Sequence, residues 1–213
     1  LQSSLKNLDK AYDNFFKGCQ SGKQVGYPGY KCKHDHNQSF TSKNNGSIKL
    51  GDGCVFMPKL GWMKCKISKR VEGRILSATL RRNAAGRYYI SLCCTDVEIK
   101  SLPNTNKQVG IDLGISSYIA TSDGDKFDNP KYLSKAEKRL KRLQRQLSRK
   151  QKDSNNRNKC RQILAKAHEK VANQRHDNIN KLTTMLIRNY DTICIEDLAV
   201  KNMVKNHHLA KVI

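Results

Sequence analysis

The clearest strand pattern of the chain lies between Lys107 and Gly124, KQVGIDLGISSYIATSDG. From Val109 to Leu113, apolar residues alternate with glycine or aspartate, which is the period of a β-strand. A second strand is expected over Ser117 to Ser122, and the Asp123-Gly124 pair that follows is a turn sequence. The stretch therefore predicts two short consecutive strands that end in a tight turn.

Asp112 is the anomaly of this stretch, because it lies between Ile111 and Leu113 in the middle of the expected strand. Burying an unpaired carboxylate costs on the order of several kcal/mol, or forces the group to take up a proton. Gly110 and Gly114 leave the same face bare, so a metal ion and a bulky anionic substrate have room to approach. Two interpretations stay open: Asp112 binds a divalent metal ion, or it caps a neighbouring loop.

The charge of the chain indicates a polyanionic partner. Its 213 residues carry 41 Lys and Arg against 18 Asp and Glu, a formal net charge of +23. Nucleic acid is the usual partner of so basic a protein, and an anionic membrane surface is the competing interpretation. No apolar run approaches the length of about 18 residues that a membrane-spanning helix needs. The chain does not begin with Met and shows no amino-terminal signal pattern, so we expect it to be a fragment.

The cysteine pattern predicts a reducing compartment and no zinc site. None of the eight cysteines lies in a C-x-x-C pair, so the pattern is not that of a disulfide framework. Cys32, His34 and His36 have a C-x-H-x-H spacing, but no second pair of ligands follows nearby. We therefore expect no zinc in this chain and interpret the cluster as a polar loop.

The first 106 residues are expected to hold one helix and then only strands. Residues 1–22 carry an apolar stripe at helical spacing that stops near Gly18, as the tail of a larger helical unit would. Turn sequences then separate short strand patterns at 39–41, 47–50, 54–57, 62–68, 74–82 and 87–95, which predicts a small antiparallel β-barrel within residues 23–106. Lys64 and Lys66 share one face of the fourth strand, and a basic face suits a phosphate backbone.

The most charged part of the chain predicts a basic helical hairpin within residues 131–190. Residues 131–176 contain sixteen Lys and Arg against three Asp and Glu. Ser134 and Glu137 have the spacing of a capping box, and a polar break at 154–158 separates the first helix from a second over 159–188. The apolar seam consists of Ala136, Leu140, Leu143 and Leu147, and of Leu164, Ala167, Val171, Leu182 and Met185.

The outside of this hairpin is the candidate nucleic-acid surface. Its candidate phosphate contacts are Arg142, Arg145, Arg149 and Arg175. A membrane partner is disfavoured, because the hairpin lacks the Trp- and Phe-rich face that an interfacial helix needs.

A second misplaced carboxylate ends the strand pattern DTICIEDLAV, Asp191 to Val200, where Ile193 and Ile195 lead into Glu196. If this strand lies beside that of Asp112, the two carboxylates converge, and they repel each other unless a cation lies between them. Mg²⁺ takes oxygen ligands and accepts water and phosphate oxygens in its remaining positions. Asp112 and Glu196 are therefore predicted to bind Mg²⁺ for metal-assisted phosphodiester hydrolysis, in which two ions commonly act together.

Four segments carry a family resemblance: VGIDLGISSYIATSDG, the basic hairpin, ANQRHDNINKLT and ICIEDLAVKNM. In this order they resemble the TnpB (OrfB) proteins of bacterial insertion sequences, which were long called transposases and are similar to type V CRISPR effector nucleases. The resemblance covers nearly the whole chain. It implies an α+β fold with the end of a helical recognition lobe (1–22), a wedge-like antiparallel β-barrel (23–106), and a partial RuvC-like, ribonuclease-H-type domain with the inserted hairpin (107–213).

The activity that the resemblance implies is RNA-guided, Mg²⁺-dependent DNA cleavage in the bacterial cytoplasm, at the nucleoid. A guide RNA would pair with target DNA while the protein holds the heteroduplex by its backbone. Asp112 matches the family's first catalytic carboxylate and Glu196 the second. The third is an Asp beyond a Cys₄ zinc ribbon, and this chain ends at Ile213 before both. The resemblance thus implies that this chain alone is an inactive remnant or a truncated piece.

Two other functions are compatible with the sequence. A non-catalytic RNA- or DNA-binding remnant or regulator would keep the basic surfaces without the chemistry. An actin-like ATPase would use GIDLGISS as a phosphate-binding hairpin. No second Gly-rich phosphate loop follows, however, and a net charge of +23 exceeds what ATP binding explains.

Overall fold

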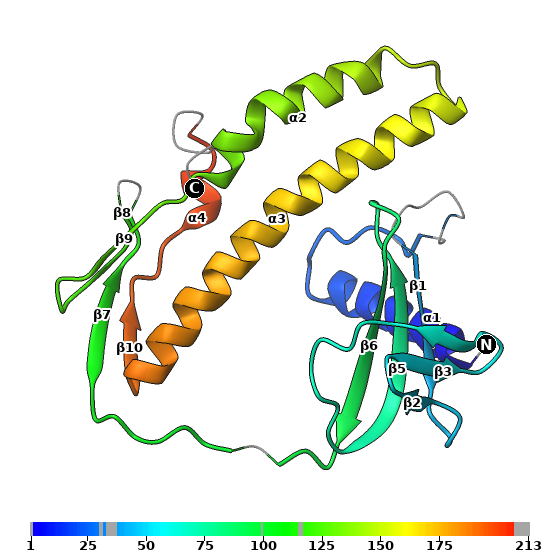
Figure 1. The fold of residues 1–213 in the computed structure, drawn as a ribbon, viewed down its shortest axis with the longest axis horizontal. Helices are drawn as coiled ribbons and strands as arrows, with labels where there is room; N and C mark the ends of the chain where they lie inside the picture. The colour runs from blue at the N-terminus through cyan, green and yellow to red at the C-terminus, as the bar shows by residue number, and fades with distance from the viewer. Residues whose placement is uncertain (1, 30–31, 33–37, 99, 115–116, 207–213) are drawn as a thin grey trace. The chain divides into compact units, whose positions relative to one another are not determined.

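The computed structural model describes residues 2–29, 32, 38–98, 100–114 and 117–206. These residues divide into two compact units, Leu1–Ile99 and Lys100–Ile213. Unit 1 combines a helix with two antiparallel sheets, and unit 2 combines a mixed sheet with a long helical hairpin (Figure 1). The predicted mixed α+β class is confirmed.

Unit 1 begins with helix α1 (Gln2–Gln20), and strands β1 to β6 follow it. One sheet has the order β1-β5-β6 and consists of β1 (Gln38–Lys43), β5 (Arg74–Arg82) and β6 (Tyr88–Thr95). The other has the order β2-β3-β4 and consists of β2 (Lys49–Gly51), β3 (Cys54–Met57) and β4 (Gly61–Lys64). Each predicted strand of this region is present, although β4 ends earlier than expected.

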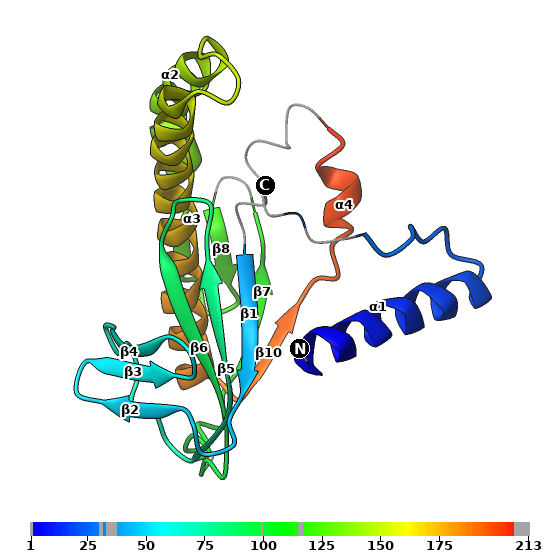
Figure 2. The same ribbon diagram turned by 90° about the vertical axis from the view of Figure 1, so that its right-hand side faces the viewer.

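The two sheets of unit 1 enclose one apolar core. Val55 and Met57 of β3 are fully buried and pack with Ala78 of β5. The strands of the second sheet run across those of the first (Figure 2). The predicted single barrel is wrong for the described residues, in which no strand of one sheet pairs with a strand of the other. The physical reason is length, because β2, β3 and β4 have only three or four residues and pair only with each other.

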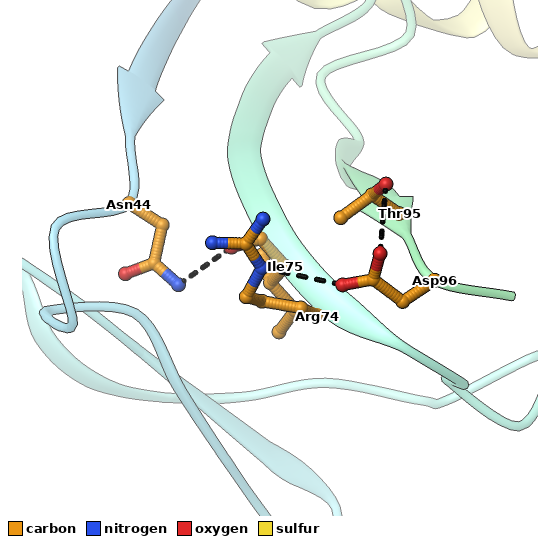
Figure 3. A network of polar contacts seen from close by, with 5 residues as sticks. All are labelled: Asn44, Arg74, Ile75, Thr95 and Asp96. Carbon is orange, nitrogen blue, oxygen red and sulfur yellow. Dashed lines mark hydrogen bonds and ion pairs between the residues drawn. The ribbon is translucent and has the colours of Figure 1, made fainter.

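A polar network fixes the turn that leads from β1 to β2 (Figure 3). The Asn44 side chain donates a hydrogen bond to the carbonyl of Ile75 (2.9 Å) and accepts one from the backbone N–H of Ile48 (2.9 Å). At the start of β5, Arg74 forms an ion pair with Asp96 (3.4 Å). Both charged side chains are largely exposed, so the Asn44 contacts contribute more to the position of this turn than the ion pair does.

Unit 2 is built on a four-stranded sheet with the order β10-β7-β8-β9. Its strands are β7 (Gln108–Asp112), β8 (Ser117–Thr121), β9 (Lys126–Asp128) and β10 (Thr192–Ile195). β7 and β8 are the two strands that the sequence predicted, and Gly124 (φ 95°) lies in the predicted turn after them. β10 runs parallel to β7, while the other neighbours are antiparallel. β9 has no counterpart among the strands predicted from the sequence.

Helices α2 (Tyr132–Ser148) and α3 (Asn155–Asn189) form the predicted hairpin between β9 and β10 (Figure 1). Its seam is confirmed by the packing of Leu140 and Leu143 of α2 with Leu164 and Val171 of α3. The predicted capping box is wrong. α2 begins directly after Lys131, which has a left-handed backbone and makes no side-chain cap, so Ser134 lies within the helix.

The predicted polar break at 154–158 is also wrong. Ser154 is the N-cap of α3, and its hydroxyl accepts a hydrogen bond from the backbone N–H of Arg157 (3.1 Å). The Arg157 guanidinium in turn donates hydrogen bonds to the carbonyls of Leu147 (3.2 Å) and Lys150 (2.8 Å), which joins the start of α3 to the end of α2. A polar first turn and a polar loop have similar compositions, so the sequence pattern alone did not separate them.

The second half of α3 packs on the sheet of unit 2. Leu186 is buried against Val109 and Ile119, with Leu182 and Met185 beside it. Leu182 and Met185, predicted for the hairpin seam, therefore belong to a different core. A four-residue helix, α4 (Val200–Met203), follows β10, so the strand ends at Ile195 and does not continue through the predicted pattern to Val200. None of the described helices is long and apolar enough to cross a membrane.

Candidate functional site

Asp112 and Glu196 lie at matching ends of two neighbouring strands. β7 and β10 pair in parallel, and their register ends with Ile111 opposite Ile195. Asp112 is the next residue of β7 and Glu196 the next after β10, so the register extended by one residue sets the two acids opposite each other. Neighbouring strands lie about 4.8 Å apart. The predicted adjacency of the two strands is confirmed.

The two acids share the face of the sheet that points away from α3. Val109, Ile111 and Ile193 pack in the core that contains Leu186 of α3. Successive side chains of a strand alternate between its faces, so the residues between and after these apolar ones belong to the opposite face. Asp112 follows that alternation within β7, and the alternation of β10 carried one residue past its end sets Glu196 on the same face. The helix and the acids thus occupy opposite sides of the same two strands.

The surroundings of both carboxylates are open. Both residues are exposed, and neither side chain forms a hydrogen bond or an ion pair with any described residue. This corrects the expectation that Asp112 is buried in the middle of a strand, because β7 ends at Asp112. The described residues contain no group of three or more His, Cys, Asp and Glu that could hold a metal ion. They therefore provide two carboxylates and not a complete metal site.

The predicted loop around Cys32 falls largely outside the described part of the chain. Cys32 itself is exposed, and His34 and His36 lie outside the described residues.

A third acid, Asp191, fixes the start of β10. Its carboxylate accepts hydrogen bonds from the backbone N–H groups of Thr105 (3.0 Å) and Asn106 (2.6 Å) and from the Thr105 hydroxyl (3.0 Å). The backbone N–H donors of Thr105 and Asn106 hold the pKa of Asp191 below its usual value. These contacts tie the segment before β7 to the residue before β10. Sequence reasoning missed this role, because the partners are 85 and 86 residues apart.

The hairpin of β8 and β9 is tied to α3 by a similar contact. The Tyr190 hydroxyl donates a hydrogen bond to the Asp123 carboxylate (2.7 Å). This hydrogen bond, with some burial, raises the pKa of Tyr190. Tyr190 is the C-cap of α3 and directly precedes Asp191, so both contacts lie near the start of β7, at the end of the strand opposite Asp112.

The predicted phosphate contacts lie on two separate units. Lys64 is the last residue of β4 in unit 1, and Lys66 follows it; both are exposed. Arg142 and Arg145 lie on α2 and Arg149 is its C-cap, all exposed. Arg175 is also exposed, but it lies on α3 and is therefore not part of the α2 surface.

Five cations form one row along α2, which we call the α2 row. Its members are Lys135, Lys138, Arg142, Arg145 and Arg149, all exposed. They recur every three or four residues, the spacing of one helix face, and span about 21 Å at 1.5 Å per residue. None of the five forms an ion pair with a described residue, and Glu137 pairs instead with Lys141 (2.9 Å), off the row. Lys135 and Lys138 were not among the predicted phosphate contacts, although their spacing relative to Arg142 is visible in the sequence.

The cations of α3 are more widely spaced. Lys159, Lys166 and Lys170 are exposed on one face, and the next on that face is Lys181. Asp177 lies between them and forms an ion pair with Lys181 (2.7 Å). The α2 row is therefore the denser line of positive charge.

The chain matches a known family and several longer relatives. Residues 91–207 match the OrfB_IS605 family, described as probable transposase. The chain is 37% identical to the "Putative RNA-guided DNA endonuclease InsQ" of Escherichia coli, over 97% of this chain and 50% of that protein. It is 36% identical to a "Putative RNA-guided DNA endonuclease" of Streptomyces pristinaespiralis, over 100% of this chain and 52% of that protein. The chain thus spans about half the length of the curated relatives it matches.

Fold and site together define a basic α+β protein with two carboxylates at the end of one parallel strand pair. The family match covers more than half of the chain and includes Asp112, Glu196 and the whole hairpin. The chain therefore belongs to the OrfB_IS605 family, which confirms the resemblance found in the sequence.

Proposed function

We propose that this chain is part of an RNA-guided DNA endonuclease of the TnpB type. One observation carries the proposal: Asp112 and Glu196, which the family resemblance assigns as catalytic carboxylates, lie at the matching ends of two neighbouring parallel strands. Family membership supports it, as do the names of the relatives from Escherichia coli and Streptomyces. Because the chain spans about half of those relatives, the activity is proposed for a longer protein that contains it.

The sheet of unit 2 supports a ribonuclease-H-like domain of the RuvC type. Three strands, β7, β8 and β9, follow one another in antiparallel order, and β10 joins β7 in parallel after the helical hairpin. The second half of α3 covers one face of this sheet. The opposite face carries both acids, and a nucleic-acid backbone would approach the site from that side.

Asp112 and Glu196 fit Mg²⁺ as part of its ligand set. Carboxylate oxygens are the ligands this ion prefers, and the exposure of both residues leaves room for water and phosphate oxygens. When bound, Mg²⁺ would supply an activated water and stabilise the leaving oxygen of a phosphodiester. The role of the two side chains would be to hold the ion at the carboxyl ends of β7 and β10.

Guide RNA and target DNA are the proposed partners of the basic surfaces. The α2 row offers five cations with no acid between them on the same face, a pattern that neutralises consecutive phosphates without reading sequence. Three of the five are arginines, which bind phosphate through two parallel hydrogen bonds. Lys64 and Lys66 of unit 1 are proposed to add contacts of the same kind.

DNA cleavage by the longer protein tests this proposal. With guide RNA, matching DNA and Mg²⁺ we expect cleavage, and Asp112→Ala or Glu196→Ala should lower its rate by about 1000-fold or more. The reason is that metal ions supply several kcal/mol of transition-state stabilisation, and each 1.4 kcal/mol is about tenfold in rate. DNA binding should persist in both variants, since the basic surfaces are untouched.

Asp125→Ala is the matched control, because it removes an exposed carboxylate from the turn between β8 and β9 without touching the pair. It should leave the cleavage rate within about twofold. Unchanged cleavage in both site variants would overturn the proposal. Salt-sensitive binding without any cleavage by the unmodified protein would instead favour a non-catalytic RNA- or DNA-binding protein.

A further inference from the structure

The sheet of β2, β3 and β4 has one buried face and one solvent face of unusual composition. Val55, Met57 and Met63 belong to the buried face and pack in the core of unit 1. The alternate residues are Lys49, Gly51, Cys54, Phe56, Trp62 and Lys64, which we call the outer face. Exposed sheet faces are usually polar, yet this one presents two aromatic rings between two lysines.

Trp62 is the centre of the outer face. It is 57% exposed, and it is the sole tryptophan of the chain. Its ring packs edge-on against that of Phe56, its cross-strand partner, with centroids 5.6 Å apart. The indole is thus supported at one edge by a second aromatic side chain while much of its surface remains in water.

The absence of a side chain at Gly51 leaves the space that the Trp62 indole occupies. A Cβ at this position would lie 2.7 Å from the Cys54 sulfur and 3.2 Å from Cζ3 of Trp62. The space over Gly51 is therefore already taken by the tryptophan ring and the thiol, and any larger residue would displace them. The ring position is defined by the sheet and is not that of a loose surface side chain.

Two lysines flank the rings. Lys49 of β2 is in register with Phe56, which in turn is in register with Trp62, so one lysine and two rings form a line across the three strands. Lys64 lies two residues after Trp62 on the same face of β4. Both lysines are exposed, and the outer face contains no acidic residue. Such a surface complements a ligand with a flat apolar part and negative charge on either side.

We propose that the outer face is a base-stacking platform for unpaired nucleotides, with a nucleobase on Trp62 and the flanking phosphates on Lys49 and Lys64. Sequence-tolerant binding of single strands combines these two elements, because every base has a π-face and every linkage a charge. In a duplex the faces of the bases are covered by their neighbours, so only blunt ends could use the ring. This inference rests on the proposed nucleic-acid binding and adds the form of nucleic acid that unit 1 takes.

The sole tryptophan gives a direct test, because a stacked base quenches indole fluorescence. The chain is titrated with a fluorescein-labelled oligo(dT) of about 12 nucleotides, a length within the site sizes of such platforms. Anisotropy of the label reports binding, and tryptophan emission reports contact with Trp62. We expect strong quenching at saturation by the single strand and little quenching by a duplex of equal length.

Variants separate stacking from charge. Trp62→Leu should weaken single-strand binding by about 5- to 150-fold, the effect of losing one stacked base, while Trp62→Phe should retain most of the affinity. Gly51→Ala should reduce quenching, since it displaces the ring. Tyr88→Leu is the matched control, because Tyr88 is 65% exposed in the same unit but lies on β6, with Arg82 over its ring. It should change the affinity by less than about twofold.

The outcomes distinguish this inference from the proposed function. Anisotropy that reports binding while tryptophan emission and the Trp62→Leu affinity stay unchanged would overturn the platform and leave nucleic-acid binding intact. Equal quenching by single strand and duplex would overturn the preference for unpaired nucleotides. Absence of any binding to either probe would overturn the platform, while the cleavage assay with the longer protein and its guide RNA tests the proposed endonuclease function separately.

Discussion

The outer face of the β2-β3-β4 sheet and the α2 row are both basic, yet only the former carries aromatic rings. The sheet sets Trp62 and Phe56 between two lysines, whereas the α2 row has five cations and no aromatic side chain. Charge alone binds phosphates of any nucleic acid, while rings add affinity only where bases are unstacked. The comparison therefore predicts that the two surfaces respond to different features of the same ligand.

Removal of positive charge from α2 is expected to lower nucleic-acid affinity more than any other change proposed here. In the variant Lys138→Gln, Arg142→Gln, Arg145→Gln, three phosphate contacts are lost. The slope of log affinity against log salt should then fall by about 2 to 3, and affinity near physiological salt by on the order of a hundredfold. Because no ring is involved, single strands and duplexes should lose affinity alike. Anisotropy titrations at several salt concentrations measure both quantities.

A triple variant of α3 controls for net charge. Lys159→Gln, Lys166→Gln, Lys170→Gln removes the same three charges from exposed helical positions that are more widely spaced. We expect it to weaken binding by less than about tenfold. Equal losses in the two triple variants would show that total charge, and not the α2 row, determines affinity.

A smaller effect concerns Asp191, which joins the start of β10 to the segment before β7. Hydrogen bonds from Thr105 and Asn106 lower the pKa of Asp191, so its contribution to stability is present above its unfolded pKa of about 3.8 and is lost as pH falls through the folded value. Asp191→Ala should therefore lower the Tm at pH 7 by about 2 to 6 °C, and the difference should shrink toward pH 3. Thermal unfolding followed by the helical circular dichroism signal measures it.

Unit 1 provides the control for that experiment. Asp96 pairs with Arg74, but both side chains are largely exposed, and such pairs contribute little. Asp96→Ala should leave the Tm within about 1 °C at either pH. A Tm difference for Asp191→Ala that grows as the pH falls would contradict the assigned role of the Asp191 hydrogen bonds.

Local periodicity accounts for most of what the sequence predicted correctly. The alternation around Val109 and Ile111 identified β7, and the spacing of Leu140 and Leu143 identified the seam of the hairpin. The relation of Asp112 to Glu196 was predicted because each acid follows an apolar strand, and such strands tend to pair. The strand and the helix seam depend on residues a few positions apart, and the position of Asp112 beside Glu196 depends only on the pairing of β7 with β10.

What the sequence did not reveal depends on distant partners. The barrel was predicted from the spacing of short strands and turn sequences, whereas closure depends on whether short strands such as β2 reach a second neighbour. The role of Asp191 depends on backbone donors that lie 85 and 86 residues away. Likewise, the fit between Gly51 and Trp62 depends on the register of three strands, since the two residues are far from adjacent in the chain.

The most direct test of the acid pair is a Mn²⁺ titration of the isotope-labelled chain followed by nuclear magnetic resonance. Mn²⁺ takes the carboxylate and water ligands that Mg²⁺ takes, and it broadens signals of nearby nuclei. Our account predicts that the amide signals at the ends of β7 and β10 broaden first, and that Asp112→Asn combined with Glu196→Gln abolishes this effect. Broadening centred elsewhere, or unchanged in that double variant, would contradict a shared metal site at Asp112 and Glu196.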